Sequence, residues 1–223
     1  LSQGWGGIQH EAGAFEIQDE GSQFIALFTL WPEIFGPGLS STPGRFEKSA
    51  EFKPHDLPLS PPAWTVIDAC AGAGGKTLAL ADALAGKGRV YAYDISEKKL
   101  QALKRRSKRA GLNNVQAVKV PSTGLGNQLE KFAGSADAVL VDAPCSGWGV
   151  LRRNPDVKWR QTEEELERLP RVQREILESY APLVKPKGRL VYSVCTFRLA
   201  ETQAQVEAFL KDHPEFKLTR GGY

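Results

Sequence analysis

Methionine is absent from this chain of 223 residues, and cysteine occurs only three times, as Cys70, Cys145 and Cys195. No apolar run approaches the length of a membrane-spanning helix, and no secretory leader is recognisable. We therefore expect no membrane partner and a reducing compartment, by default the cytoplasm. Because the chain starts at Leu1 and contains no methionine, we also expect it to be a piece of a longer protein.

Histidine is scarce as well, and neither sign of charge is in large excess. The three histidines, His10, His55 and His213, are scattered, and no group of His and Cys has the spacing of metal ligands, so we expect no metal site. The net charge of +3, from 29 Lys and Arg against 26 Asp and Glu, permits a polyanionic partner but does not argue for one. The oligomeric state has no signature in the sequence.

From Ala63 onward, strand-like and helix-like patterns alternate along the chain. Short β-branched runs alternate with apolar residues at helical spacing, as in parallel strands joined by crossover helices. We expect strands near 64–69, 89–94, 115–120, 136–142 and 188–195, and helices at 76–85, 96–110 and 172–183. This order predicts an open, mostly parallel, doubly wound α/β sheet, whose ligands bind beyond the carboxyl ends of the strands.

The segment before Ala63 differs in composition. We expect residues 1–62 to form an N-terminal extension, with a helix at 22–31 and a linker rich in Pro and Gly at 36–62. The main domain then covers 63–223.

Shorter signals describe the last third of the chain. We expect Pro170 to break the helical pattern around it into two helices, the first beginning at Thr162 with a capping box to Glu165. A helix at 200–212 and a last strand at 216–219 follow.

The stretch DACAGAGGKT, Asp68 to Thr77, forms a glycine turn after the first strand. A Walker A loop would require glycine at position 70, which is cysteine, and a dinucleotide fingerprint would require glycine at position 77, which is threonine. The turn therefore lacks both phosphate-binding motifs. Its glycines still allow close backbone approach, and the following helix N-terminus favours an electron-rich ligand.

The second strand, RVYAYD, ends at Asp94, twenty residues after Gly74. A carboxylate at this place can accept hydrogen bonds from ribose hydroxyls. Together with the glycine turn, it favours a nucleoside ligand without a pyrophosphate, such as S-adenosylmethionine. The alternative is a strand-to-helix turn with a structural role alone.

Two cysteines follow the ends of two later strands. Asp142 and Cys145 leave one strand in VDAPCSG, and Cys195 leaves the next long one in RLVYSVCT. Both thiols are expected to face the crevice that holds the methyl group of the cofactor. The alternative for either cysteine alone is a small buried hydrophobic residue, and for Cys70 that alternative is stronger.

Taken together, these motifs resemble the Sun/Fmu-type (RsmB-like) RNA (cytosine-5)-methyltransferases, catalytic domain. The matching stretches are CAGAGGKT at 70–77, YD at 93–94, DAPCSGWG at 142–149, RNPDVKW at 153–159 and KPKGRLVYSVCTF at 185–197, with FEIQDEGSQ at 15–23 upstream. The resemblance covers nearly all of 15–216. It implies the class I S-adenosylmethionine-dependent methyltransferase (Rossmann-like) fold, S-adenosyl-L-methionine as cofactor, and ribosomal or transfer RNA as partner.

The resemblance also implies roles for the site residues. Cys195 is the nucleophile that adds to C6 of cytosine, and Cys145 assists release of the adduct, whereas spacing alone leaves open which thiol attacks. Asp142 suits the N3 and amino edge of the base, and Lys76 supplies positive charge near the base or the cofactor; the alternatives are a capping acid and a solvated lysine. The expected cofactor contacts are Cys70, Ala71, Gly72, Ala73, Gly74, Gly75, Lys76, Asp94 and Asp142.

The loop after Cys145 combines bases with aromatic residues. Trp148 and the expected RNA-binding residues Arg152, Arg153, Lys158, Trp159 and Arg160 can contact phosphates and stack on bases. The helix at 96–110 carries seven Lys or Arg, which we interpret as a solvated outer face.

Two positions depart from the family pattern. Ala73 stands where proline is common, and Pro121 with Ser122 stands where the third strand usually ends in an acid that contacts the adenine of the cofactor. The second departure keeps open a protein that binds RNA on the same fold but methylates weakly. A third possibility, DNA cytosine-5 methylation, would use Cys145 as nucleophile and require no thiol at 195.

Overall fold

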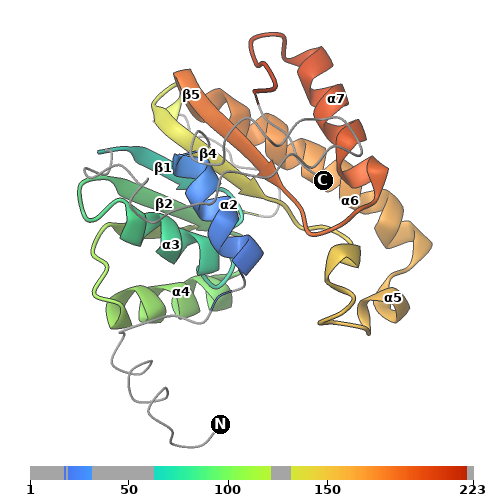
Figure 1. Ribbon diagram of the computed structural model, residues 1–223, viewed down its shortest axis with the longest axis horizontal. Coiled ribbons are helices and arrows are strands. Elements are labelled where there is room, and N and C mark those ends of the chain that lie inside the picture. Colours follow the sequence, from blue (N-terminus) through green and yellow to red (C-terminus); the bar gives the residue numbers. More distant parts are fainter. Residues whose placement is uncertain (1–17, 19, 32–62, 122–131, 220–223) are drawn as a thin grey trace, which may run out of the picture.

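The computed structural model describes residues 18, 20–31, 63–121 and 132–219. Within these ranges, the strands form one parallel sheet in the order β3-β2-β1-β4-β5 (Figure 1). They are β1 (Thr65–Asp68), β2 (Arg89–Asp94), β3 (Val115–Lys119), β4 (Ala136–Asp142) and β5 (Val184–Ser193). The predicted strands are confirmed, although β5 begins earlier than expected.

Helices cover both faces of this sheet (Figure 1). One layer consists of α2 (Glu20–Leu30), α3 (Gly75–Ala83) and α4 (Glu97–Arg109), and the other of α6 (Glu163–Tyr180) and α7 (Gln203–Asp212). In β1, Val66 packs with the first layer and Ile67 with the second, as the two-residue period of a strand requires. The predicted doubly wound α/β fold is confirmed.

The N-terminal helix belongs to the same core as the sheet. Ala26 and Leu30 of α2 are buried against Leu80 and Leu84, which α3 and its end contribute. The linker predicted at 36–62 lies outside the described residues.

The prediction that Pro170 separates two helices is wrong, because α6 is one helix with Pro170 inside it. A proline has no N–H for the carbonyl four residues earlier, here that of Leu166. Arg198 Nη1 donates to the Leu166 carbonyl oxygen at 3.0 Å instead. The Thr162 cap is confirmed by the bond from Glu165 N to Thr162 Oγ1 at 3.2 Å.

The last expected strand, at 216–219, is also wrong, because these residues have no regular structure. Phe216 instead packs on Phe209 of α7, with ring centroids 5.4 Å apart. His213 stacks on the same Phe209 ring at 4.4 Å, so an aromatic cluster fixes the chain after α7.

Short helical turns lie between or at the ends of the longer elements; they are η5 (Trp148–Val150), α5 (Val157–Arg160), η6 (Ala181–Leu183) and η7 (Leu199–Glu201). Of these, η5 and α5 lie where the sequence predicted no helix, whereas η6 and η7 overlap the helices expected at 172–183 and 200–212. None of the helices in the described ranges is long and apolar enough to cross a membrane. Among the same residues, no group of three or more His, Cys, Asp or Glu is arranged to hold a metal ion.

Candidate active site

The two thiols that follow β4 and β5 lie in contact. Cys145 Sγ is 3.3 Å from Cys195 Sγ, and the Cys195 backbone N–H donates to Cys145 Sγ at 3.3 Å. Asp142 pairs with Ser193 in the sheet, so both strands end at the same level and their loops run side by side. The structure thus brings the two predicted thiols together at the carboxyl edge of the sheet, whereas Cys70 is not part of this pair.

The two thiols differ in acidity. The pKa of Cys195 is lowered to about 7, chiefly because Cys145 hydrogen-bonds to it, and Lys76 adds a smaller effect in the same direction. The same hydrogen bond, together with burial, raises the pKa of Cys145. Cys195 is exposed and Cys145 is only partly so, and the lower pKa of Cys195 therefore belongs to the more accessible of the two thiols.

An ion pair lies beside the thiols. Lys76 Nζ is 2.6 Å from Asp142 Oδ2 and donates to Ser22 Oγ of α2 at 3.2 Å. Only 15% of the Lys76 side chain is exposed, so it is not a solvated lysine. The pair places a positive charge and a carboxylate where β1 and β4 diverge, the place at which this class of sheet binds ligands.

The glycine turn closes tightly at the start of α3. Gly74 is the N-cap residue with a φ of 93°, and a Cβ at this position would lie 2.7 Å from Leu103 Cγ. Arg106 Nη1 of α4 donates to the Ala73 carbonyl oxygen at 2.7 Å. A larger residue at 74 would therefore be strained and would push α4 away from the turn.

Asp94 connects the turn to the end of β2. Its carboxylate accepts from Gly72 N at 2.8 Å and from Ser96 N at 2.7 Å, and it is nearly buried. Each oxygen keeps a second lone pair for a ribose hydroxyl. Nothing lies within 4 Å of the place where a Cβ of Gly72 would be, so backbone and ligand can approach there. The acceptor oxygens of Asp94 and the open turn fit a nucleoside cofactor.

Asp68 is a residue that the sequence analysis did not assign to the site. It is buried at the end of β1, and burial raises its pKa to about 7 against the hydrogen bond from Thr77 Oγ1, which is 2.6 Å long. Its Oδ1 atom has no hydrogen-bond partner among the described residues. The neighbouring Cys70 packs in the core, and burial raises the pKa of its thiol, so it is not a candidate nucleophile. The sequence did contain a signal for Asp68, because an acid at the end of the first strand lies at the edge of the sheet where ligands bind.

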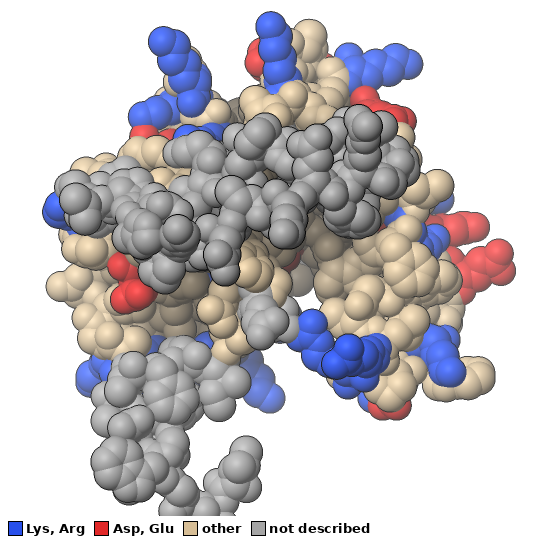
Figure 2. All heavy atoms as spheres, in the orientation of Figure 1, with Lys and Arg blue, Asp and Glu red and all other residues tan. Residues whose placement is uncertain are grey.

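The loop after Cys145 projects away from the sheet at α5 (Figure 1). Trp148 lies 5.8 Å from Phe197, and Gly149 N donates to the Cys195 carbonyl oxygen at 3.0 Å, so the start of this loop lies against the thiols. The expected RNA-binding residues are all exposed; they are Arg152, Arg153, Lys158, Trp159 and Arg160. Figure 2 shows Lys and Arg side chains gathered over this part of the molecule. Trp159 is 79% exposed, with Lys158 Nζ 4.9 Å from its ring centroid.

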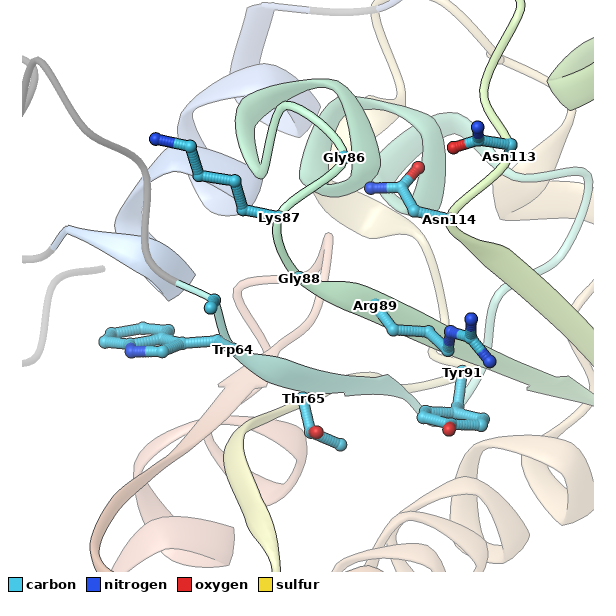
Figure 3. A pocket seen from close by; sticks show the side chains of 10 residues that line it. Trp64, Thr65, Gly86, Lys87, Gly88, Arg89, Tyr91, Asn113 and Asn114 are labelled. Carbon is cyan, nitrogen blue, oxygen red and sulfur yellow. The ribbon is translucent and has the colours of Figure 1, made fainter.

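A cavity of about 510 Å³ lies at the opposite edge of the sheet (Figure 3). Trp64, Thr65 and Arg89 line it at the amino ends of β1 and β2. Because the thiols, Asp94 and Asp142 all lie at the carboxyl ends, this cavity is separate from the candidate active site.

Comparison with known proteins adds a family to this geometry. The chain matches the family described as 16S rRNA methyltransferase RsmB/F over residues 58–222. It is 40% identical over 153 residues to a probable ribosomal RNA small subunit methyltransferase B of Bacillus subtilis (strain 168), covering 69% of this chain and 34% of the relative. The chain therefore spans about a third of the length of that relative.

Two solved structures have the same fold. The crystal structure of PH0851 superimposes with a TM-score of 0.76 at 31% identity, covering 94% of this chain and 40% of the other. NSun6 from Pyrococcus horikoshii, in complex with an analogue of S-adenosylmethionine, gives a TM-score of 0.67 at 26% identity, covering 92% and 44%.

Proposed function

Because the chain belongs to the RsmB/F family of 16S rRNA methyltransferases, we propose that it methylates C5 of cytosine in RNA through a covalent adduct with Cys195. The resemblance to RsmB-like enzymes in the sequence is thereby confirmed, and S-adenosyl-L-methionine is the methyl donor of this family. The observation that carries the proposal is the distance of 3.3 Å between two thiols beside the Lys76–Asp142 pair.

The chemistry requires a nucleophile that adds reversibly to the ring. C5 of cytosine becomes nucleophilic once a thiolate has added at C6, and Cys195 is the thiol with the lowered pKa. A bond forms between Cys195 Sγ and C6 while the C5–C6 double-bond electrons move toward C5. When bound, S-adenosylmethionine supplies an electrophilic methyl group and retains the electron pair of the broken carbon–sulfur bond.

The other site residues act on the base and on release. Asp142 holds a proton at N3 of the cytosine, which draws electrons out of the ring as Cys195 adds, and Lys76 keeps the Asp142 carboxyl in place. After transfer, a base takes the C5 proton, the electrons of that C–H bond restore the C5–C6 double bond, and Cys195 leaves C6 as a thiolate with the electrons of the broken bond. Cys145, in contact with Cys195 Sγ, assists this second half.

The cofactor contacts follow from the turn and the strand ends. The residues that we propose around the cofactor are Cys70, Ala71, Gly72, Ala73, Gly74, Gly75, Lys76, Asp94 and Asp142. Asp94 accepts from the ribose hydroxyls, and the backbone of the turn approaches the remainder of the ligand.

For the polynucleotide, we propose ribosomal RNA in the cytoplasm, since the relative from Bacillus subtilis is named for the small ribosomal subunit. Arg152, Arg153 and Lys158 contact phosphates, and Trp159 stacks on a base. The target cytosine must be unpaired or flipped out to reach Cys195.

One observation favours a weaker enzyme as a second candidate. Pro121, two residues after the end of β3, is exposed and its side chain offers no hydrogen-bond acceptor, whereas family members usually carry an acid there. If this weakens cofactor binding, Pro121→Asp should bind S-adenosylmethionine about tenfold more tightly than the wild type by calorimetry, since a hydrogen bond to a charged group contributes about 1.5 kcal/mol. Equal affinity of the two proteins removes this candidate.

The decisive experiment compares wild type, Cys145→Ala and Cys195→Ala with labelled S-adenosylmethionine and RNA that lacks the modification. Denaturing gels should reveal a covalent protein–RNA adduct with Cys145→Ala and none with Cys195→Ala, and nucleoside analysis of wild-type product should yield 5-methylcytidine. An adduct that requires Cys145 instead would reverse the roles and favour the DNA-type mechanism. Label on another nucleoside would refute the proposal.

A further inference from the structure

Glu201 is a fully buried carboxylate to which the proposed chemistry assigns no role. It ends η7, six residues after Cys195, and three donors point at its carboxylate. Ser146 N donates to Oε2 at 2.8 Å, Gln173 Nε2 donates to Oε2 at 2.9 Å, and Arg198 Nη1 donates to Oε1 at 2.8 Å.

One side of this arrangement holds the loop of Cys145. Ser146, whose N–H donates to Glu201, is the next residue after Cys145 and is itself buried. The residue before Cys145 is held by the same group, because Gln173 Nε2 also donates to the Pro144 carbonyl oxygen at 2.9 Å. Both neighbours of Cys145 are thus fixed from the Glu201 side.

The other side holds the loop of Cys195. Glu201 N donates to the Arg198 carbonyl oxygen at 2.9 Å, and Tyr192 OH, near the end of β5, donates to the Glu201 carbonyl oxygen at 2.7 Å. The Thr196 hydroxyl, next to Cys195, lies 2.7 Å from Ser146 Oγ and joins the two loops directly. Glu201 therefore belongs to the Cys195 loop and reaches the Cys145 loop through its side chain.

A buried carboxylate is an expensive way to obtain stability alone. Removing an ion pair from water costs several kcal/mol per ion, and apolar residues of similar size often stabilise a core equally well. What an apolar residue does not provide is a directional acceptor for the N–H of Ser146. The geometry that depends on this acceptor is the placement of Cys145.

We propose that Glu201 is a positioning residue that holds the Pro144–Ser146 segment against the loop after β5 and so keeps the two thiols at contact distance. Its importance for methyl transfer rests on the proposed function, whereas its control of the thiol pair does not. Cys145 hydrogen-bonds to Cys195 only at this distance, so loosening the Cys145 loop makes Cys195 behave as an ordinary thiol.

The test is the pH profile of alkylation by iodoacetamide in the full chain, with each cysteine quantified by mass spectrometry and no RNA present. In Glu201→Ala, the midpoint for Cys195 should rise from about 7 toward the ordinary thiol value of about 8.5. The rate at pH 7 should fall about threefold, since the smaller thiolate fraction is partly offset by greater nucleophilicity. Cys145 should be labelled several-fold faster at pH 9.

Two variants separate positioning from general damage. Glu201→Gln keeps an acceptor for Ser146 N and Gln173, so its midpoint should stay near that of the wild type. Glu207→Ala, on the exposed side of α7, is the matched control and should change nothing. If the proposed methyl transfer is active, Glu201→Ala should lower kcat by about 10- to 100-fold at unchanged affinity for S-adenosylmethionine, because small displacements of reacting groups carry such losses.

An unchanged profile for both thiols in folded Glu201→Ala overturns the inference. If that variant does not fold, Gln173→Leu decides, because it removes the link to Pro144 while Glu201 keeps Ser146 and Arg198. A shift of the Cys195 midpoint in the same direction supports the inference, and no shift overturns it. If the wild type shows no methyl transfer but Glu201→Ala shifts the Cys195 midpoint, the proposed function is refuted and the positioning role of Glu201 stands.

Discussion

The guanidinium of Arg198 donates to the carbonyl oxygen of Leu166, the acceptor that Pro170 leaves without its helical donor. A side chain from the Cys195 loop thereby completes α6, and α6 in turn supplies Gln173 to the Cys145 loop. The proline is tolerated because Arg198, 32 positions after Leu166, replaces the missing bond to the Leu166 carbonyl oxygen.

This relationship predicts a coupling between positions 170 and 198. Arg198→Ala should destabilise the protein, and the loss should be about 1 kcal/mol smaller when Pro170→Ala restores the helical N–H, since one hydrogen bond is then no longer missing. Urea unfolding of the wild type, both single variants and the double variant measures the coupling. Additive free energies of unfolding would contradict it.

The Lys76–Asp142 pair predicts a change in thiol acidity. Lys76 lowers the pKa of Cys195, so Lys76→Met should move the alkylation midpoint of Cys195 above 7 and reduce methyl transfer by about 100-fold or more, the usual effect of losing a charge at a reacting centre. Stopped-flow alkylation between pH 5 and 10 follows the midpoint. Lys104→Met, on the exposed face of α4, is the control. An unmoved midpoint would show that Lys76 acts on Asp142 alone.

Asp68 predicts a pH dependence of stability. Its pKa rises from 3.8 in the unfolded chain to about 7 in the folded protein, so the folded state holds the proton more tightly. The stability from this group is fully present below pH 3.8 and is lost as the pH rises to 7. The loss is on the order of 2–4 kcal/mol.

Asp68→Asn removes this titration. The free energy of unfolding of the variant, measured in urea, should rise relative to that of the wild type between pH 4.5 and pH 8. Thr77 Oγ1 can still donate to the amide oxygen, so the variant is expected to fold. A constant difference between the two proteins across this range would mean that Asp68 ionises normally.

The loop around α5 predicts a salt-dependent effect on RNA affinity. Arg152→Ala and Lys158→Ala should each weaken RNA binding and reduce the slope of log K against log salt by about 0.7–0.9, the value for one phosphate contact. Filter binding at several salt concentrations measures both quantities. Lys211→Ala on α7 should leave the slope unchanged. An equal slope in all proteins would place the RNA elsewhere.

Much of the site followed from the sequence because the strands are parallel. Their carboxyl ends lie along one edge, so Asp94, Asp142 and the two cysteines had to lie along that edge once the strands were recognised. The glycine turn was predictable for a similar reason, since Gly74 adopts a φ that other residues avoid.

Contacts between distant side chains were not predictable in this way. The Lys76–Asp142 pair spans 66 positions, and Glu201 reaches Ser146 across 55, with no local pattern to reveal either. Pro170 was misjudged because the rule for proline in helices considers only the helix itself. The strand expected at 216–219 is absent, and Phe216 packs on Phe209 of α7 instead.

The N-terminal helix changes what counts as the smallest unit that can fold and act. A chain trimmed to begin at Ala63 would keep the strands, the glycine turn and both thiols. It would also expose Leu80 and Leu84 to solvent, and Lys76 would lose its hydrogen bond to the Ser22 hydroxyl. The folded unit around the thiols therefore includes α2, and a transplant or a fusion of this unit must carry α2 along with the sheet.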